Sequence, residues 1–344
     1  MKIIHLTAHI GHGGDWTIIR SLMEVFEARG HQVMIGGCQA SLTKFESIEM
    51  PLNQGAKGFI KALGKLNEIP KDTDIVHTHN PISLLLAVTF KYLHCRSAKI
   101  IFTYHWDTPD SKIKKLLKSS LFQLADVIHS YSIDISQLLE KKYKIDKVKN
   151  YLAYVGCDSS RFSAKSLIEK KQNRERYGLT ENAFILLFVG RLSLEKNISL
   201  IFKYLNNQQS EELIFLIAGD GPLKYELKKE CQDLQIEDRV HFLGRVENIE
   251  IIYSLADLLV LPSSSMETFG MVVIEAAFCG LPTLRSDLPG ANDQITDGKD
   301  GFIFPTKQPE KMFQILDEIW ANRSQLPEIG QKARDRALEN FTIE

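Results

Sequence analysis

Residues 184–197 read FILLFVGRLSLEKN, and this stretch indicates which kind of fold the chain adopts. Six apolar residues in a row, followed by a glycine, are typical of a strand that is covered on both faces of a parallel sheet. Similar short apolar runs recur through the second half of the chain. We expect strands there at residues 184–189, 213–218, 239–243, 257–262, 282–285 and 302–304.

The first half of the chain has the same alternation. We expect strands at residues 2–8, 32–36, 74–79, 98–103, 126–131 and 150–155, with helices between most of them, such as 16–29, 82–94 and 132–143. Strands that alternate with helical patterns predict parallel βαβ units. A highly charged stretch at 163–182 then predicts a linker with a short helix.

The predicted fold class is therefore α/β, with two Rossmann-like doubly wound domains at residues 1–165 and 166–344. A length of 344 residues suits roughly two domains. Ligands of such sheets bind outside the carboxyl ends of the strands, so the residues just after each strand are the informative ones. Whether the last helix packs back on the N-terminal domain is left open.

Composition and charge restrict the class of protein. No apolar run approaches the roughly 20 residues that span a bilayer. The five cysteines lie far apart, which favours a reducing cytoplasm over a disulfide framework or a zinc site. The net charge of −1 and the lack of a basic motif with interleaved aromatic residues argue against nucleic-acid binding.

Two charged motifs follow strands of the second half. Arg191 and Lys196 come directly after the first strand, and two such cations can neutralise a diphosphate. Residues 262–280 read PSSSMETFGMVVIEAAFCG, in which Glu267 lies at a helix entrance and Glu275 lies on its otherwise apolar helix. A carboxylate within VVIEAAF needs a hydrogen-bond donor, such as a ribose hydroxyl.

Backbone amides supply a further candidate anion site. The amides of Phe269, Gly270 and Met271 are expected at the start of that helix, where they could bind a phosphate or sugar oxygen. In the first half, the turn that contains Gly13 and Gly14 joins a strand to a helix and lets a ligand approach the backbone.

In these motifs the chain resembles the retaining GT-B glycosyltransferases, in particular the glycosyl transferases group 1 family. The hallmark is the pair Glu267 and Glu275, separated by seven residues. The resemblance covers nearly the whole chain and is most specific from about 184 to 305. The best matches of the looser first half are HTHNP at 77–81 and TYH at 103–105.

The resemblance implies a role for each motif residue. Arg191 and Lys196 would bind the diphosphate, Glu275 the ribose and Glu267 the hydroxyls of the donor sugar. His105 would be the active-site histidine, and Arg245 would flank the base. The turn at Gly13 and Gly14 would face the phosphates and the acceptor across a cleft.

Some positions depart from the family pattern. Asn197 replaces a common glycine, Gln294 stands where an acidic residue is usual, and residues 155–158 read VGCD, without the usual asparagine. None of these changes affects the pair of glutamates.

No cofactor and no metal ion are expected. Asp72-Thr73-Asp74 has the DxD form that binds a metal in another glycosyltransferase fold, but it precedes a strand, away from the edge where ligands bind. The pairs His77/His79 and His9/His12 are interpreted as a strand alternation and a loop, since no carboxylates stand nearby at ligand spacing.

These residues predict a metal-independent, retaining enzyme that transfers a sugar from a nucleoside-diphosphate donor, with UDP favoured. The expected acceptor is a lipid-linked glycan in the synthesis of a cell-surface polysaccharide. The alternatives are a soluble small-molecule acceptor, a sugar-nucleotide epimerase of the same fold, and a non-enzymatic subunit that binds sugar nucleotides.

A basic amphipathic stretch suggests peripheral contact with the inner face of an anionic membrane. Between residues 111 and 124, apolar residues share one helical face beside Lys112, Lys114, Lys115 and Lys118. Residues 57–65 are similar, and residues 1–165 contain 22 basic against 15 acidic side chains. The alternative is that the apolar face packs on the sheet of its own domain.

Overall fold

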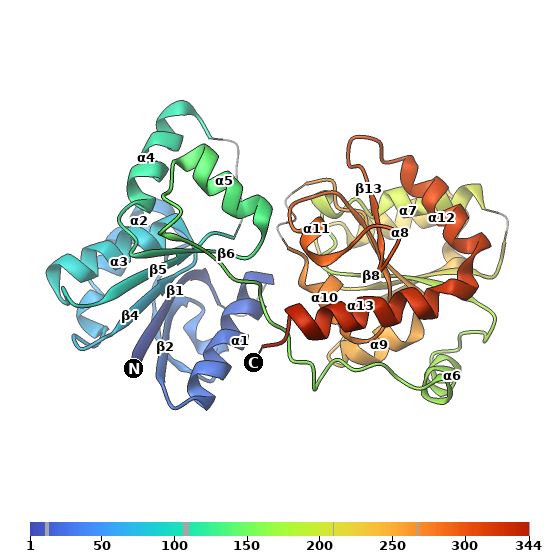
Figure 1. Ribbon diagram of the computed structural model, residues 1–344, viewed down its shortest axis with the longest axis horizontal. Helices are drawn as coiled ribbons and strands as arrows, with labels where there is room; N and C mark the ends of the chain where they lie inside the picture. The colour runs from blue at the N-terminus through green and yellow to red at the C-terminus, as the bar shows by residue number, and fades with distance from the viewer. Residues whose placement is uncertain (11–13, 106–109, 209, 266, 268, 344) are drawn as a thin grey trace. The chain divides into compact units, whose positions relative to one another are not determined.

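The computed structural model describes residues 1–10, 14–105, 110–208, 210–265, 267 and 269–343 (Figure 1). It confirms the predicted fold class, because two parallel sheets with helices on both faces form two separate compact units, Met1–Val155 and Gly156–Glu344. The division comes earlier than the boundary expected after residue 165. Cys157 bridges to Thr342, and its amide donates to the carbonyl of Phe341 at 2.8 Å, which places this segment in the second unit.

The first unit contains a seven-stranded parallel sheet in the order β3-β2-β1-β4-β5-β6-β7. Its strands are β1 (Lys2–His9), β2 (Gln32–Cys38), β3 (Glu46–Glu49), β4 (Ile75–Thr78), β5 (Lys99–Thr103), β6 (Val127–Ser130) and β7 (Asn150–Leu152). Its helices are α1 (Gly14–Ala28), α2 (Gly55–Leu63), α3 (Pro81–Leu93), α4 (Lys112–Phe122) and α5 (Ile133–Tyr143), with short 3₁₀ turns η1 (Ala40–Leu42) and η2 (Leu66–Glu68).

The second unit contains a six-stranded parallel sheet in the order β10-β9-β8-β11-β12-β13. Its strands are β8 (Phe184–Val189), β9 (Leu213–Ala218), β10 (Val240–Gly244), β11 (Leu258–Leu261), β12 (Thr283–Ser286) and β13 (Phe302–Phe304). Its helices are α6 (Leu167–Arg176), α7 (Ser199–Asn207), α8 (Lys224–Asp233), α9 (Ile249–Leu255), α10 (Met271–Phe278), α11 (Ala291–Gln294), α12 (Lys311–Ala321) and α13 (Leu326–Asn340), with 3₁₀ turns η3 (Leu194–Lys196), η4 (Glu237–Arg239) and η5 (Arg323–Gln325).

The core of the second unit explains why its strands are apolar throughout. Helices α7, α8 and α12 cover one face of the sheet, and α9, α10 and α13 cover the other (Figure 1). Residues 185–188 of β8 are fully buried, so both faces of this central strand are covered. The last helix, α13, packs on α10 of its own unit, where the Arg334 guanidinium donates to the Phe278 carbonyl at 2.7 Å.

Each sheet has one point at which the order of its strands along the chain reverses direction. This point indicates where a ligand site is expected. In the second unit the reversal lies between β8 and β11, and in the first unit between β1 and β4. Loops that leave two such strands diverge to either side, which opens a space at the carboxyl edge of the sheet. The motif residues around 191 and 267 follow β8 and β11.

Glycines allow the loops at this edge to approach each other. Gly190 and Gly219 follow β8 and β9, Gly244 is the last residue of the neighbouring β10, and the amide of Gly219 donates to the Gly244 carbonyl at 2.7 Å. Gly219 has a φ of +148°, and a Cβ there would lie 1.8 Å from the carbonyl oxygen of Gly190. A side chain at this position would therefore displace the loop that carries the diphosphate-binding candidates.

We predict that Gly219→Ala lowers the free energy of unfolding of the second unit by about 2–4 kcal/mol, because backbone strain and a backbone clash add. Gly298→Ala is the matched control. Gly298 also has a positive φ, +72°, but a Cβ there would meet nothing within 4 Å. It should cost only about 1 kcal/mol. Urea unfolding measures both, and equal losses would refute the role of the close approach.

Candidate active site

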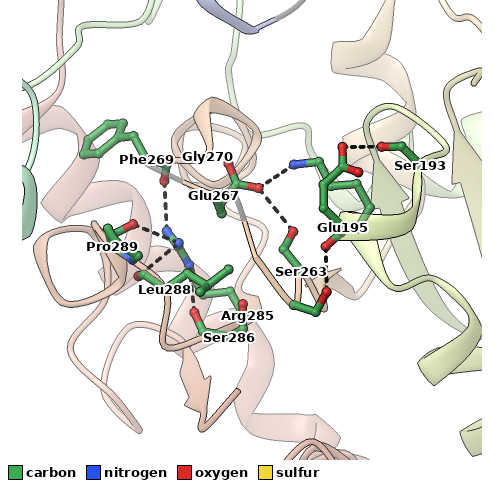
Figure 2. A network of polar contacts seen from close by, with 12 residues as sticks. Ser193, Glu195, Ser263, Glu267, Phe269, Gly270, Arg285, Ser286, Leu288 and Pro289 are labelled. Atoms are coloured by element: carbon green, nitrogen blue, oxygen red, sulfur yellow. Dashed lines mark hydrogen bonds and ion pairs between the residues drawn. The ribbon is translucent and has the colours of Figure 1, made fainter. Parts of the chain in front are cut away.

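An ion pair joins the loops that leave β8 and β11. The ammonium of Lys196 lies 2.5 Å from a carboxylate oxygen of Glu267, and the two side chains are only 18 % and 10 % exposed. The hydroxyl of Ser263 donates to the same oxygen at 3.2 Å (Figure 2). Because each partner is part-buried, the pair is screened less by solvent than a surface salt bridge.

The two loops are also joined through their backbones. The amide of Ser264 donates to the carbonyl of Glu195 at 2.8 Å. The Ser193 hydroxyl donates to the Glu195 carboxylate at 2.5 Å (Figure 2). Burial alone would raise the pKa of Glu195, but the hydrogen bonds from Ser193 and from the residue's own backbone amide, together with the nearby charges of Lys196 and Arg191, lower it below its ordinary value. The charged residues at 195 and 196 are therefore held in place before any ligand binds.

Asn197 has the backbone conformation that the family's glycine would adopt. Its φ of 51° and ψ of 41° lie in the left-handed region at the end of η3. Asparagine tolerates this region better than other residues with a Cβ. The substitution noted in the sequence therefore preserves the turn that presents Lys196.

The helix that carries Glu275 begins at Met271, a little later than expected. Gly270 precedes it with a φ of 79°, and its carbonyl accepts from the amide of Val273 at 2.9 Å. This geometry directs the first amides of α10 out of the helix, where an anion can bind them. Phe269 itself is buried and contacts Phe341 edge-on, with ring centroids 5.9 Å apart.

Glu275 has the hydrogen-bond donor that its apolar helix required. The hydroxyl of Tyr253, on α9, donates to its carboxylate at 2.7 Å. Burial raises the pKa of Glu275, although this hydrogen bond and the nearby Arg161 oppose the rise. The carboxylate is thus part-buried and directed toward a single polar partner, an arrangement that suits exchange of that partner for a ligand hydroxyl.

The two remaining cations of the predicted site are exposed at the same edge of the sheet. Arg191 follows β8 and Arg245 follows β10, and neither forms an ion pair with another described residue. Arg245 and Lys224 contribute to the lowered pKa of Asp220, after the hydrogen bond from the Gly221 amide. Both arginines are available to a ligand that approaches the carboxyl ends of the strands.

His105 in the first unit belongs to a buried row of imidazoles. Its Nε2 lies 3.0 Å from Nδ1 of His79, and Nε2 of His79 lies 3.1 Å from Nδ1 of His5. A second row runs from His77 through the Thr103 hydroxyl to His129, at 2.7 and 3.0 Å, and ends on the carbonyl of Ala153. Burial lowers the pKa of His105 and of His5 to about 3, so both rings are neutral.

Three histidines of this cluster lie close enough together to be candidate ligands of a metal ion. One nitrogen from each of His5, His77 and His79 lies within 4.8 Å of the others. The three ligands are neutral and buried, and the group includes no carboxylate. A dication held there would lack a compensating negative charge, which is costly in the interior. The rows described above use Nδ1 of His5, whereas Nε2 of His5 is buried without a hydrogen-bond partner among the described residues.

The other predicted residues of the first unit are placed as follows. Gly14 opens α1, whereas Gly13 lies outside the described residues. Lys112, Lys114 and Lys115 are exposed on α4, but Lys118 lies 2.9 Å from the buried carboxylate of Asp110. Asp72 pairs with Lys2 before β4, at the edge of the sheet away from the carboxyl ends of the strands.

Sequence reasoning missed several polar residues that support the site. These are His5, Ser263, Tyr253, the buried Gln294 and the buried Arg285, of which Arg285 contacts the Phe269–Gly270 turn (Figure 2). Arg285 carried a signal, since an arginine within the strand TLRS must satisfy its donors when buried. Gln294 carried another, as a departure from the family pattern. The position of Tyr253 in the sequence gave no indication.

Comparisons with known proteins identify the family to which the chain belongs. The sequence profile of the glycosyl transferases group 1 family matches residues 169–336, and that of Glycosyltransferase Family 4 matches residues 12–161. The chain therefore belongs to the glycosyltransferases, and its two units have the GT-B fold.

Two relatives by sequence and one solved structure illustrate what the chain resembles. The chain is 25% identical to the N-acetyl-alpha-D-glucosaminyl L-malate synthase of Bacillus anthracis, over 100% of the chain and 94% of that protein. It is 29% identical to the alpha-monoglucosyldiacylglycerol synthase of Streptococcus pneumoniae, over 85% and 72%. Its fold matches the crystal structure of Anabaena HepE in complex with UDP-glucose, with a TM-score of 0.85 and 19% identity over 99% and 96% of the two chains.

We predict that the first unit loses stability as the pH falls below about 6.5. A histidine whose pKa is lower when folded than when unfolded takes up a proton first in the unfolded state, so acid favours unfolding. The pKa of His5 falls from 6.5 to about 3. Between pH 7 and pH 5.5, the free energy of unfolding should therefore fall by about 1 kcal/mol less in His5→Phe than in the wild type. Urea unfolding at both pH values tests this, and an equal loss in wild type and variant would contradict it.

Proposed function

We propose that this glycosyltransferase is a retaining, metal-independent enzyme that transfers a sugar from a nucleoside-diphosphate donor, preferably a UDP-sugar. The observation that carries the proposal is the part-buried pair of Lys196 and Glu267 beside the first turn of α10. A cation, a carboxylate and outward-directed amides at one sheet edge suit the diphosphate and the hydroxyls of one sugar nucleotide. HepE, a protein of the same fold, was crystallised with UDP-glucose, which supports the preference for uridine.

Each residue has a role in this proposal. Arg191, Lys196 and the amides at the entrance of α10 bind the diphosphate, and Glu267 binds hydroxyls of the donor sugar. Glu275 accepts hydrogen bonds from the ribose in place of Tyr253. Arg245 flanks the base. In the first unit, we assign Gly14 to the phosphates and His105 to orientation of the sugar, as the family resemblance implies.

The chemistry follows from where charge develops. The acceptor oxygen bonds to the anomeric carbon while the bond from that carbon to the β-phosphate oxygen breaks, through an oxocarbenium-like transition state. The departing phosphate takes the acceptor proton, and attack on the face that it leaves retains the configuration. Lys196, Arg191 and the amides stabilise the growing phosphate charge, so no metal ion is required.

The acceptor proposal rests on the exposed face of α4. Ile113, Leu116 and Leu117 are 73%, 68% and 65% exposed, so this part of the helix does not pack on its own sheet as the alternative required. Lys112 and Lys115 are exposed beside them. An apolar face with flanking lysines suits the headgroup layer of an anionic membrane.

Such a contact would bring the enzyme to a lipid-linked glycan acceptor on the inner face of the membrane. The Streptococcus pneumoniae relative is named for a diacylglycerol product, which is a lipid. The Bacillus anthracis relative is named for L-malate, so a small soluble acceptor is the competing proposal. Among the described residues, no helix combines the length and the apolar character that crossing a membrane requires.

We expect Lys196→Ala to lower kcat for donor turnover by about 100-fold or more in EDTA-containing buffer, with a smaller rise in KM, because the phosphate charge grows in the transition state. The control is Lys332→Ala, which removes an ammonium from an exposed pair with Glu328. It should leave both constants unchanged. A raised KM with unchanged kcat would exclude the leaving-group role, and loss of wild-type activity in EDTA would exclude metal independence.

We predict that the protein sediments with vesicles of phosphatidylglycerol at low salt, and that the triple variant Lys112→Glu/Lys114→Glu/Lys115→Glu does not. Each lysine near an anionic surface contributes about 1 kcal/mol. The triple variant Lys203→Glu/Lys228→Glu/Lys229→Glu makes the same charge change on exposed lysines of the second unit. If both variants bind equally, α4 is not the contact. If wild type does not bind, the soluble acceptor is favoured.

A further inference from the structure

A buried guanidinium lies directly behind the amides that the proposed function assigns to the diphosphate. Arg285 on β12 is 0% exposed and contacts two loops at the carboxyl edge of the sheet (Figure 2). Toward the loop after β11, it donates to the Phe269 carbonyl at 2.9 Å. Toward the loop after β12, it donates to the carbonyls of Leu288 and Pro289 at 3.5 and 3.3 Å. One side chain thus holds the two loops together.

Gln294 completes this contact. Its side-chain carbonyl accepts from the Arg285 guanidinium, and its amide donates to the Gly270 carbonyl at 3.3 Å. Both residues are at most 5% exposed. An acidic residue at position 294 could accept from the arginine in the same way, but a carboxylate could not donate to a carbonyl. The departure from the family pattern at this position therefore adds a contact to Gly270.

These contacts determine which way the neighbouring amides point. In a planar trans peptide, the carbonyl of one residue and the amide of the next point in opposite directions. Because the Phe269 carbonyl faces Arg285, the Gly270 amide faces away from it. The Gly270 carbonyl accepts from Val273 and from Gln294, so the Met271 amide points out of the helix entrance.

We infer that Arg285 and Gln294 are positioning residues that fix the Gly270 and Met271 amides in the orientation that binds the distal phosphate of the donor. The inference rests on the proposed function, since it specifies how the same diphosphate site is held. Preorganised donors cost no reorganisation when the ligand binds, which is why their orientation matters. The φ of 79° at Gly270 allows the chain to turn at this point without a Cβ that would resist it.

The inference predicts a loss that depends on the number of phosphates. Gln294→Leu and Arg285→Met should each weaken binding of UDP about tenfold, and binding of UMP less than twofold, because only the distal phosphate contacts these amides. A role in folding alone would weaken both nucleotides equally. Gln294→Leu keeps the arginine and its bond to Phe269, so it still gives a result if Arg285→Met does not fold.

Arg336→Met is the matched control. Arg336 donates to the carbonyl of Asp293 at 2.8 Å and to the hydroxyl of Thr296 at 3.1 Å, so it also supports α11 but does not touch the Phe269–Gly270 turn. It should leave the ratio of UDP to UMP affinity unchanged. Calorimetric titration of UDP and UMP into each folded variant gives the ratios, and the melting temperature reports stability separately.

The outcomes separate the two claims. A selective loss of UDP affinity in Gln294→Leu, with the ratio intact in Arg336→Met, supports the inference. An unchanged ratio in Gln294→Leu, or an equal change in the control, overturns it while leaving the proposed function standing. Wild-type protein that binds UDP, GDP and ADP no better than UMP, GMP and AMP would contradict the proposed diphosphate site itself, and the inference with it.

Discussion

The ion pair between Lys196 and Glu267 is the interaction on which the proposed site depends. It joins the loops of β8 and β11, the two strands between which the sheet reverses its connections. Both side chains are part-buried, so removing one of them would leave the other charge without a partner, at a cost in free energy. The pair therefore keeps a cation and a carboxylate ready at the edge of the sheet, and a bound diphosphate can replace the carboxylate as the partner of Lys196.

The two units differ in the charge and burial of their polar site residues. The second unit brings charges to its edge: Lys196, Arg191 and Glu267 follow strands, and buried Arg285 supports the turn beside them. The first unit keeps a neutral row of imidazoles behind His105, where burial disfavours protonation. A neutral ring can orient a sugar by hydrogen bonds without attracting the phosphate charge. The division suits a reaction in which negative charge develops only on the leaving group.

Much of the fold could be predicted from the sequence, because strands buried on both faces are uniformly apolar. Strand β8 has the predicted bounds, and β9 does as well. Strand β3 was missed, since its four residues, ESIE, include one buried side chain and have no apolar run. The sequence also does not show that residues 156 and 157 belong to the second unit, because that placement depends on contacts with the distant residues 341–343.

Prediction of the site was limited by long-range contacts. Glu275 stood out because a carboxylate is rare on an apolar helix, and Glu267 because it lies at the entrance of that helix, but the sequence could not identify Tyr253 as the partner of Glu275. The histidines at 77 and 79 were assigned to strand alternation, which does place both on one face. The rows that they form with His5 and Thr103 require strands from three parts of the chain to lie side by side.

The most direct test of this account is a crystal structure of the protein with UDP. The account predicts that the β-phosphate lies within hydrogen-bonding distance of the Gly270 and Met271 amides, and that the ammonium of Lys196 has moved from Glu267 to a phosphate oxygen. It also predicts that the ribose hydroxyls contact Glu275. A nucleotide bound elsewhere, or one bound at this edge while Lys196 keeps its contact with Glu267, would contradict the account.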